Sequence, residues 1–369
     1  MIKFIKKEPV LSAAAVLAII TSFIILPSRE TLASIDFRVL SILFCLMTVT
    51  SGLDEEGVLT KAASFLLSKA KKWRTVYLSL VLLCFFSSMV VTNDVALIAF
   101  VPFAIKTIHM TGRQKSLIKV VVMQTIAANL GSMLTPIGNP QNLYLYSLAG
   151  ISTFEFIKNM SVMWLGSLVF ILLSAFTEKN DEMKEYEHEH HARMRKRNVT
   201  LYAALFVVSI LSVMHVFHFA VSFAIVCITV FIRNRRLFRK TDYSLLLTFI
   251  FFFVFIHNIK SMEYVRHFLE GIITGNEFIA GFALSQIISN VPAAILISGF
   301  TDKFMVLAAA VNLGGLGTII ASMASLISYK FYSCTANADV KKFMVMFTKW
   351  NVIFIVLLVP FVMITLNMI

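Results

Sequence analysis

The chain has 369 residues, of which 58% are hydrophobic and only 14% are charged, and its mean hydropathy is +0.83. Its apolar runs repeatedly reach the roughly 20 residues that span a hydrocarbon core, which excludes an ordinary soluble domain and indicates several membrane crossings. The net charge of +13 comes from short Lys and Arg clusters between apolar runs, a pattern typical of positive-inside membrane proteins that argues against nucleic-acid binding.

The first half of the chain, residues 1–177, is predicted to form one structural repeat. It opens with apolar spans near 9–26 and 36–53, followed by an amphipathic connector over roughly 54–74. The first span is longer than the apolar part of a signal peptide and further spans follow, so we expect a retained helix.

Two regions of this half do not fit simple spans. Residues 75–109 form two apolar arms around a polar tip, Thr92-Asn93-Asp94, and residues 116–150 contain NLGSMLTPIGNPQN within an uncharged run. Gly, Pro and Asn at this density interrupt helices, and irregular backbone at membrane depth survives only inside protein or beside a cavity. We therefore predict a re-entrant hairpin over 75–109 and a discontinuous transmembrane helix over 116–150, followed by a span near 153–176.

A charged linker over 178–198 is predicted to separate the halves on the cytoplasmic side. Its run of His188, His190 and His191 lacks a fixed carboxylate or thiolate partner, so no metal site is predicted. Residues 199–217 are predicted to form an additional transmembrane helix that links the two repeats.

The second repeat is predicted over 218–369. It contains a hairpin over 276–300 with the tip Ser289-Asn290, and a broken helix over 303–329 that carries NLGGLGTIIASMAS. His257 and Asn258 precede this hairpin and are expected at the external membrane interface. The fold class is therefore an all-α polytopic membrane protein with two repeats.

The two halves match at corresponding positions. The pair Thr92-Asn93 corresponds to Ser289-Asn290, the triplet NLG at 129–131 corresponds to NLG at 312–314, and Asp36 answers Asp242 at the start of an apolar span. The odd number of crossings before the second half inverts it in the membrane. Inverted repeats with interrupted helices are typical of secondary transporters whose site lies near the midplane.

Charge counting predicts a cytoplasmic N-terminus and an external C-terminus in the cell inner membrane. In this orientation all but six of the 33 Lys and Arg residues are cytoplasmic. The external six are Arg29, Arg38, Lys158, Lys260, Arg266 and Lys303.

The motifs over residues 36–369 resemble the ion transporter superfamily that contains citrate and dicarboxylate permeases, arsenite permeases and some sodium/proton antiporters. The resemblance is carried by TND at 92–94, SNVP at 289–292, GSMLTPIGNPQN at 131–142 and GGLGTIIASMAS at 314–325. Sodium-coupled dicarboxylate members have Ser-Asn-Thr at both tips. The acid after the first Asn and the Pro after the second are more similar to the arsenite-permease branch.

The resemblance implies a site where two hairpin tips meet two broken helices. Substrate contacts are then expected from Thr92, Asn93, Asp94, Ser289, Asn290, Asn142 and Ser325. Coupling-ion contacts are expected from Ser88, Asn93, Asp94, Gly131, Thr135, Gly138 and Asn139, and from Ser285, Asn290, Gly314, Thr318 and Ser322.

Asp94 carries the sharpest functional hypothesis. It is the only charged residue between Thr75 and Ile105, and the second tip has no acid at this position. One interpretation is an N-cap, which Asp favours. An acid at membrane depth costs roughly 2.5 to 3.5 kcal/mol on insertion scales, however, so a coupling role is favoured: a proton or sodium ion neutralises Asp94 before an anion binds.

The sequence thus predicts a secondary active permease for a small inorganic or carboxylate anion, driven by a proton or sodium gradient. An arsenite-type efflux permease and a sodium/proton antiporter are the alternatives, with a passive channel less favoured. No enzyme is expected, because no HExxH, GxSxG or paired catalytic aspartates occur. No cofactor is expected beyond the coupling proton or sodium ion, and a homodimer is left open.

Overall fold

A computed structural model describes residues 9–67, 70–182, 195–336 and 338–366. Within these ranges the regular structure is helical, apart from one isolated bridge between Lys72 and Glu182. The predicted all-α class is confirmed. The histidine run of the linker lies outside the described residues.

Among the described residues, the first half contains nine α-helices and two short 3-10 turns, η1 (Gln114–Ser116) and η2 (Ala175–Thr177). The α-helices are α2 (Pro9–Ile24), α3 (Arg29–Ala33), α4 (Phe37–Glu55), α5 (Val58–Leu67), α6 (Trp73–Val91), α7 (Asn93–Met110), α8 (Leu117–Ser132), α9 (Pro140–Ala149) and, completing this half, α10 (Thr153–Ser174).

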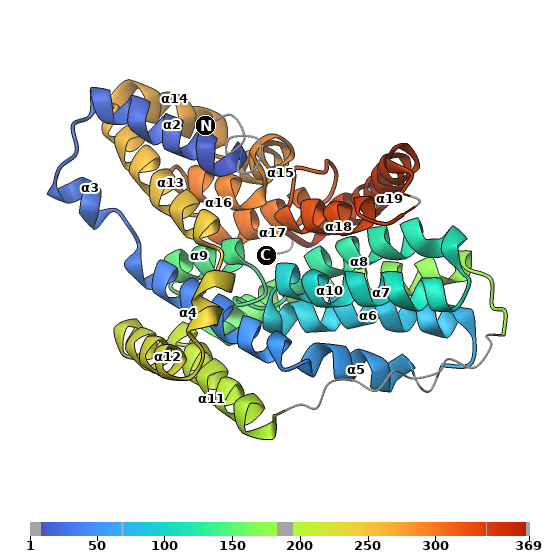
Figure 1. Cartoon of the computed structure of the whole chain (residues 1–369). Coiled ribbons are helices and arrows are strands. Elements are labelled where there is room, and N and C mark those ends of the chain that lie inside the picture. The colour runs from blue at the N-terminus through green and yellow to red at the C-terminus, as the bar shows by residue number, and fades with distance from the viewer. Residues whose placement is uncertain (1–8, 68–69, 183–194, 337, 367–369) are drawn as a thin grey trace.

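The second part of the chain opens with two helices, α11 and α12, that pack on α4, as Figure 1 shows. Its elements are α11 (Lys196–Val213), α12 (Phe219–Arg233), η3 (Arg235–Lys240), α13 (Tyr243–Ser261), α14 (Glu263–Ile273), α15 (Glu277–Ile288), α16 (Asn290–Ser298), α17 (Phe304–Gly314), α18 (Met323–Ser333) and α19 (Val340–Leu366).

Within the described ranges, seven helical segments are long and apolar enough to cross a membrane, and the bent pair α14–α15 makes an eighth if it is counted as one span. The chain is therefore a multi-pass membrane protein. The arms of the two hairpins differ in length: α6 and α7 have 19 and 18 residues, whereas α15 and α16 have only 12 and 9. At 1.5 Å per residue the second pair is too short to cross a 30 Å core.

Helix starts that correspond between the halves share the same local geometry. Asp36 caps α4 with φ −78° and ψ 86°, and Asp242 caps α13 with φ −78° and ψ 87°. Each carboxylate accepts one 2.9 Å bond, from the N–H of Val39 or of Leu245. The match found in sequence is thus a match in backbone conformation.

Asn258, which is expected near the external membrane interface, is fully buried on α13, the helix that packs against α2. Its Nδ2 donates to Thr21 Oγ1 and Ser22 Oγ, both at 3.1 Å. Figure 1 shows α2 lying alongside α13. Hydropathy alone could not show which face of α13 meets this partner.

The first residues of the charged linker are fastened to the first half. Glu178 receives Lys119 Nζ at 2.7 Å and Trp73 Nε1 at 2.7 Å, and the side chains of Glu178 and Lys119 are only 10% and 11% exposed. The Lys119 ammonium also lies over the rings of Tyr77 and Trp350. The first residue of the predicted linker, Glu178, is therefore still packed against the helices of the first half.

We expect Glu178→Gln to lower the free energy of unfolding by about 3 kcal/mol, because it leaves the nearly buried Lys119 charge without its carboxylate. The nearby Asp181→Asn removes a pair with Arg113 whose side chains are 29% and 50% exposed, and should change stability by less than about 1 kcal/mol. Thermal unfolding in detergent measures both. Equal shifts would show that Glu178 is no anchor.

Candidate functional site

The two predicted tips are single-residue connections with nearly identical backbone angles. Thr92, between α6 and α7, has φ 78° and ψ 154°, and Ser289, between α15 and α16, has φ 79° and ψ 156°. A non-glycine residue in this region stores roughly 1 to 3 kcal/mol of strain, which the surrounding structure must offset. Such strain is typical of functional sites.

Each tip is tied to the interrupted segment of its own half by one backbone hydrogen bond. The N–H of Asn93 donates to Gly138 O at 3.0 Å, and the N–H of Asn290 donates to Ala321 O at 2.9 Å. The interrupted segments run between α8 and α9 and between α17 and α18. Irregular backbone that has no helical partners is thus satisfied by the hairpin tips.

The threonines of the interrupted segments add a second tie. Thr135 Oγ1 donates to Met89 O at 2.5 Å, and Thr318 Oγ1 donates to Gln286 O at 2.9 Å. In the second half only, the Gln286 side chain also donates to Gly314 O at 2.7 Å. Hairpin and broken helix therefore form one connected unit in each half.

Two buried asparagines join the halves to each other. Asn129 Oδ1 accepts from Asn93 Nδ2 at 3.2 Å and from Ser322 Oγ at 3.0 Å, while its Nδ2 donates to Gly315 O at 3.2 Å. The Nδ2 of Asn290 also lies against Gly315. The two tip asparagines thus approach the same small region.

Asn312, which corresponds to Asn129 in the second half, bonds to asparagines of the first half. Its Oδ1 accepts from Asn139 Nδ2 at 2.9 Å, and its Nδ2 donates to Asn142 Oδ1 at 2.6 Å. Asn139 also donates to Ser132 Oγ at 3.0 Å. All four of these side chains are at least 98% buried. A neutral amide network therefore occupies the junction of the two broken helices.

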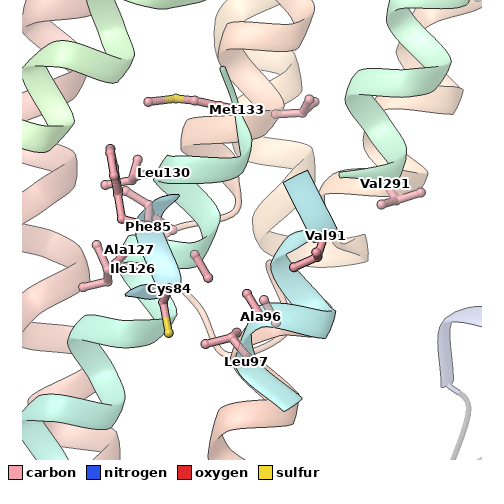
Figure 2. Packing of buried hydrophobic residues seen from close by; sticks show 14 of the residues in the cluster. Cys84, Phe85, Val91, Ala96, Leu97, Ile126, Ala127, Leu130, Met133 and Val291 are labelled. Atoms are coloured by element: carbon pink, nitrogen blue, oxygen red, sulfur yellow. The ribbon is translucent and has the colours of Figure 1, made fainter. Parts of the chain in front are cut away.

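Apolar packing surrounds this network. In Figure 2 Val91 and Ala96 flank the first tip, Phe85 lies beside Leu130, and Val291 comes from the second hairpin. The low dielectric that such packing creates strengthens the hydrogen bonds among the buried amides.

A cavity of about 120 Å³ lies beside the first tip. Asp94 and Thr92 line it from the hairpin, Asn139 lines it from the start of α9, and Lys240 and Asp242 line it from the segment before α13. Residues of α4 close its other side. In this cavity Asn139 of the amide network lies near the ionisable side chains of Asp94, Lys240 and Asp242.

Asp94 is not the N-cap of α7. Thr92 occupies that position, and its Oγ1 accepts from Val95 N at 3.5 Å. Asp94 Oδ1 is buried and has no hydrogen-bond partner among the described residues. Leaving one oxygen of an ionised carboxylate buried and without a partner is costly, so its burial favours the neutralised form of this group.

The remaining predicted residues take different roles. Ser88 and Ser285 donate to carbonyls of their own helices, and the hydroxyl of Ser325 is buried without a hydrogen-bond partner among the described residues. Gly131 and Gly314 allow close helix contact: a Cβ on Gly131 would lie 1.9 Å from Phe85 O, and one on Gly314 would lie 2.7 Å from Ser285 Oγ.

Sequence reasoning missed four site residues: Asn129, Asn312, Lys240 and Asp242. The repeated NLG triplets and the Asp36–Asp242 correspondence were the signals available for three of them. Among the described residues no group of three or more His, Cys, Asp or Glu side chains could hold a metal ion.

Comparisons of the sequence with known proteins point to a family of transporters. The sequence profile of the family described as citrate transporter (CitMHS) matches residues 1–301. The chain is similar to an uncharacterized transporter of Methanocaldococcus jannaschii, with 32% identity over 324 residues that cover 87% of each chain.

Two further relatives are more distant. The inner membrane protein YbiR of Escherichia coli is 27% identical over 302 residues, which cover 81% of this chain and 80% of the relative. The silicon efflux transporter LSI3 of Oryza sativa is 28% identical over 143 residues, which cover 39% of this chain and 29% of the relative.

Proposed function

The chain belongs to the citrate transporter family, and from this premise we propose that it is a secondary active transporter that moves a small inorganic or carboxylate anion across the inner membrane. Transport is coupled to a proton or sodium gradient and proceeds by alternating access. The observation that carries the proposal is the shared amide network, in which hairpin tips and broken helices of both halves converge beside the Asp94 cavity.

The site suits an anion because helix starts supply its positive potential. The helices α7 and α16 both begin at the tips, where the helix dipole favours negative charge. Neutral side chains of Thr92, Asn93, Ser289 and Asn290 give hydrogen bonds without a fixed charge. Binding is therefore weak enough for release on the other side.

Asp94 supplies the coupling. An anion brought beside an ionised Asp94 is repelled, so neutralisation of the carboxylate by a proton or sodium ion raises the affinity for the anion. Linkage is reciprocal, and the bound anion raises the affinity for the cation in turn. Joint movement of both is symport.

The partial similarity to a silicon efflux transporter supports a second candidate, efflux of a neutral hydroxide such as silicic or arsenious acid. With a neutral substrate that binds the ionised carboxylate, proton and substrate compete for Asp94. Competition yields antiport rather than symport.

Uptake into proteoliposomes distinguishes these functions. Citrate, smaller carboxylates, phosphate and silicic acid are tested with and without sodium and with a pH gradient of either sign. We expect saturable uptake of an anion that rises with an inward proton or sodium gradient. Gradient-driven movement of silicic acid in the opposite direction would support the antiporter, and unsaturable, uncoupled flux of the tested solutes would contradict both.

A further inference from the structure

The cavity beside Asp94 joins two parts of the protein that are far apart in sequence. Asp94 belongs to the first hairpin, whereas Asp242 begins α13 in the second half, and both line the same space. The charged groups that face this cavity are Asp94, Asp242 and Lys240. Glu55 lies behind Lys240, with its Oε2 3.3 Å from the ammonium.

The capping role of Asp242 does not account for its place in the cavity. Its Oδ1 accepts from Leu245 N, as the Oδ1 of Asp36 accepts from Val39 N in the first half. The two residues have the same backbone angles and the same 2.9 Å cap bond. Asp242 lines the Asp94 cavity, and Asp36 is not among its lining residues.

The ammonium of Lys240 is paired with Glu55. Lys240 is the last residue of η3 and lies two positions before Asp242, the cap of α13. The cavity therefore presents two carboxylates together with the hydroxyls of Ser51 and Thr92 and the amide of Asn139. Oxygen donors of this kind are the ligands that small hard cations prefer.

We propose that the coupling cation, a sodium ion or a proton, binds between Asp94 and Asp242, and that Lys240 is an internal competitor for this site. This inference rests on the proposed function, which it deepens by adding a second carboxylate that does not belong to the hairpin. The unpartnered, buried Oδ1 of Asp94 is the group that the cation satisfies.

A site divided in this way links cation binding to the position of the hairpin. The cation is held by both carboxylates only while the first tip lies beside the start of α13. Movement of the hairpin separates the two carboxylates and lowers the affinity. By linkage, the bound cation then favours the conformation in which the tip and α13 are together.

Binding of ²²Na⁺ to the purified full chain in detergent, without any anion, tests this site. We expect Asp242→Asn to weaken ²²Na⁺ binding by at least about tenfold, as Asp94→Asn does. Asparagine is itself a good N-cap, so this variant keeps the start of α13. Lys240→Met should strengthen binding.

The matched control is Asp36→Asn, which removes a charge from the equivalent cap and should leave binding within twofold of the parent. Should Asp242→Asn fail to fold, Asp242→Ser retains a capping oxygen and takes its place. If the cation is a proton, the parent takes up one more proton between pH 9 and pH 6 than Asp94→Asn, and in Asp242→Asn this uptake shifts to lower pH because the neighbouring negative charge is gone.

Parental ²²Na⁺ binding and proton uptake by Asp242→Asn would overturn the inference, as would an equal loss in Asp36→Asn. Because no anion is present, failure to find a transported anion would leave this result unaffected. Conversely, coupled anion transport with cation binding that is insensitive to Asp242 would keep the proposed function and remove the divided site.

Discussion

Replacing Gly131 with alanine is expected to lower the free energy of unfolding by about 3 kcal/mol or more and to abolish transport. The added Cβ would lie 1.9 Å from Phe85 O, a backbone atom of α6 that no side-chain rotation moves. Overpacking of this kind typically costs 1 to 3 kcal/mol, and a backbone obstacle places it at the upper end. The two helices would have to separate where Ser88 and the first tip are positioned.

Alanine substitutions at two other glycines should destabilise the protein less. Gly314→Ala meets Cβ and Oγ of Ser285 at 2.7 Å and no backbone atom closer than 3.3 Å, so its effect should be smaller. Gly271→Ala on α14 meets nothing within 4 Å and should be neutral or stabilise by up to about 1 kcal/mol through helix propensity. Thermal unfolding in detergent and uptake in proteoliposomes measure the series. Wild-type stability of Gly131→Ala would show that α6 and α8 do not pack this closely.

Asp94→Asn is expected to eliminate coupling while the protein remains folded. The variant removes the only ionisable group of the first tip, and Thr92 rather than Asp94 caps α7, so the helix start is kept. Because an acid at membrane depth costs roughly 2.5 to 3.5 kcal/mol, its neutral replacement should not lower stability. In the parent, coupling free energies of ordinary size correspond to rate or affinity changes of roughly 5- to 150-fold with the gradient.

The measurement is uptake as a function of external pH and of sodium concentration, with thermal stability recorded on the same preparations. Asp302→Asn, in the exposed turn between α16 and α17, removes an acid outside the site and should keep the parental dependence. If Asp94→Asn responded to the gradients as the parent does, Asp94 would have no part in coupling.

Much of this site could be located from sequence because its polar residues interrupt apolar runs. The hydroxyl–Asn pairs at 92–93 and 289–290 mark the one-residue tips, and the Gly- and Pro-rich motifs mark the interrupted helices. Repetition made the signal stronger, since the same departures from an apolar span occur twice.

The connections between the halves could not be predicted in the same way. Asn129 was visible only as part of a repeated triplet, and nothing local shows that its amide reaches Gly315. The sequence indicates that Asp242 begins a helix, and the structure confirms this. Its position in the same cavity as Asp94 depends on how α13 packs against the first hairpin. Contacts between distant segments follow from tertiary packing, which periodicity does not encode.

The central claim is that the two halves enclose one site that opens alternately to the two sides of the membrane. Its most direct test places a cysteine at Val95, which lines the Asp94 cavity, in a chain whose four native cysteines are replaced by alanine. A second variant that retains only the exposed Cys334 is the control with fixed exposure.

Both variants are labelled in oriented membrane vesicles with a membrane-impermeant maleimide from either side, with and without the coupling cation and the transported substrate. The account predicts that Val95→Cys reacts from one side in one condition and from the other side in another, while Cys334 always reacts from the same side. Labelling of Val95→Cys from a single side under all conditions would contradict alternating access at this site.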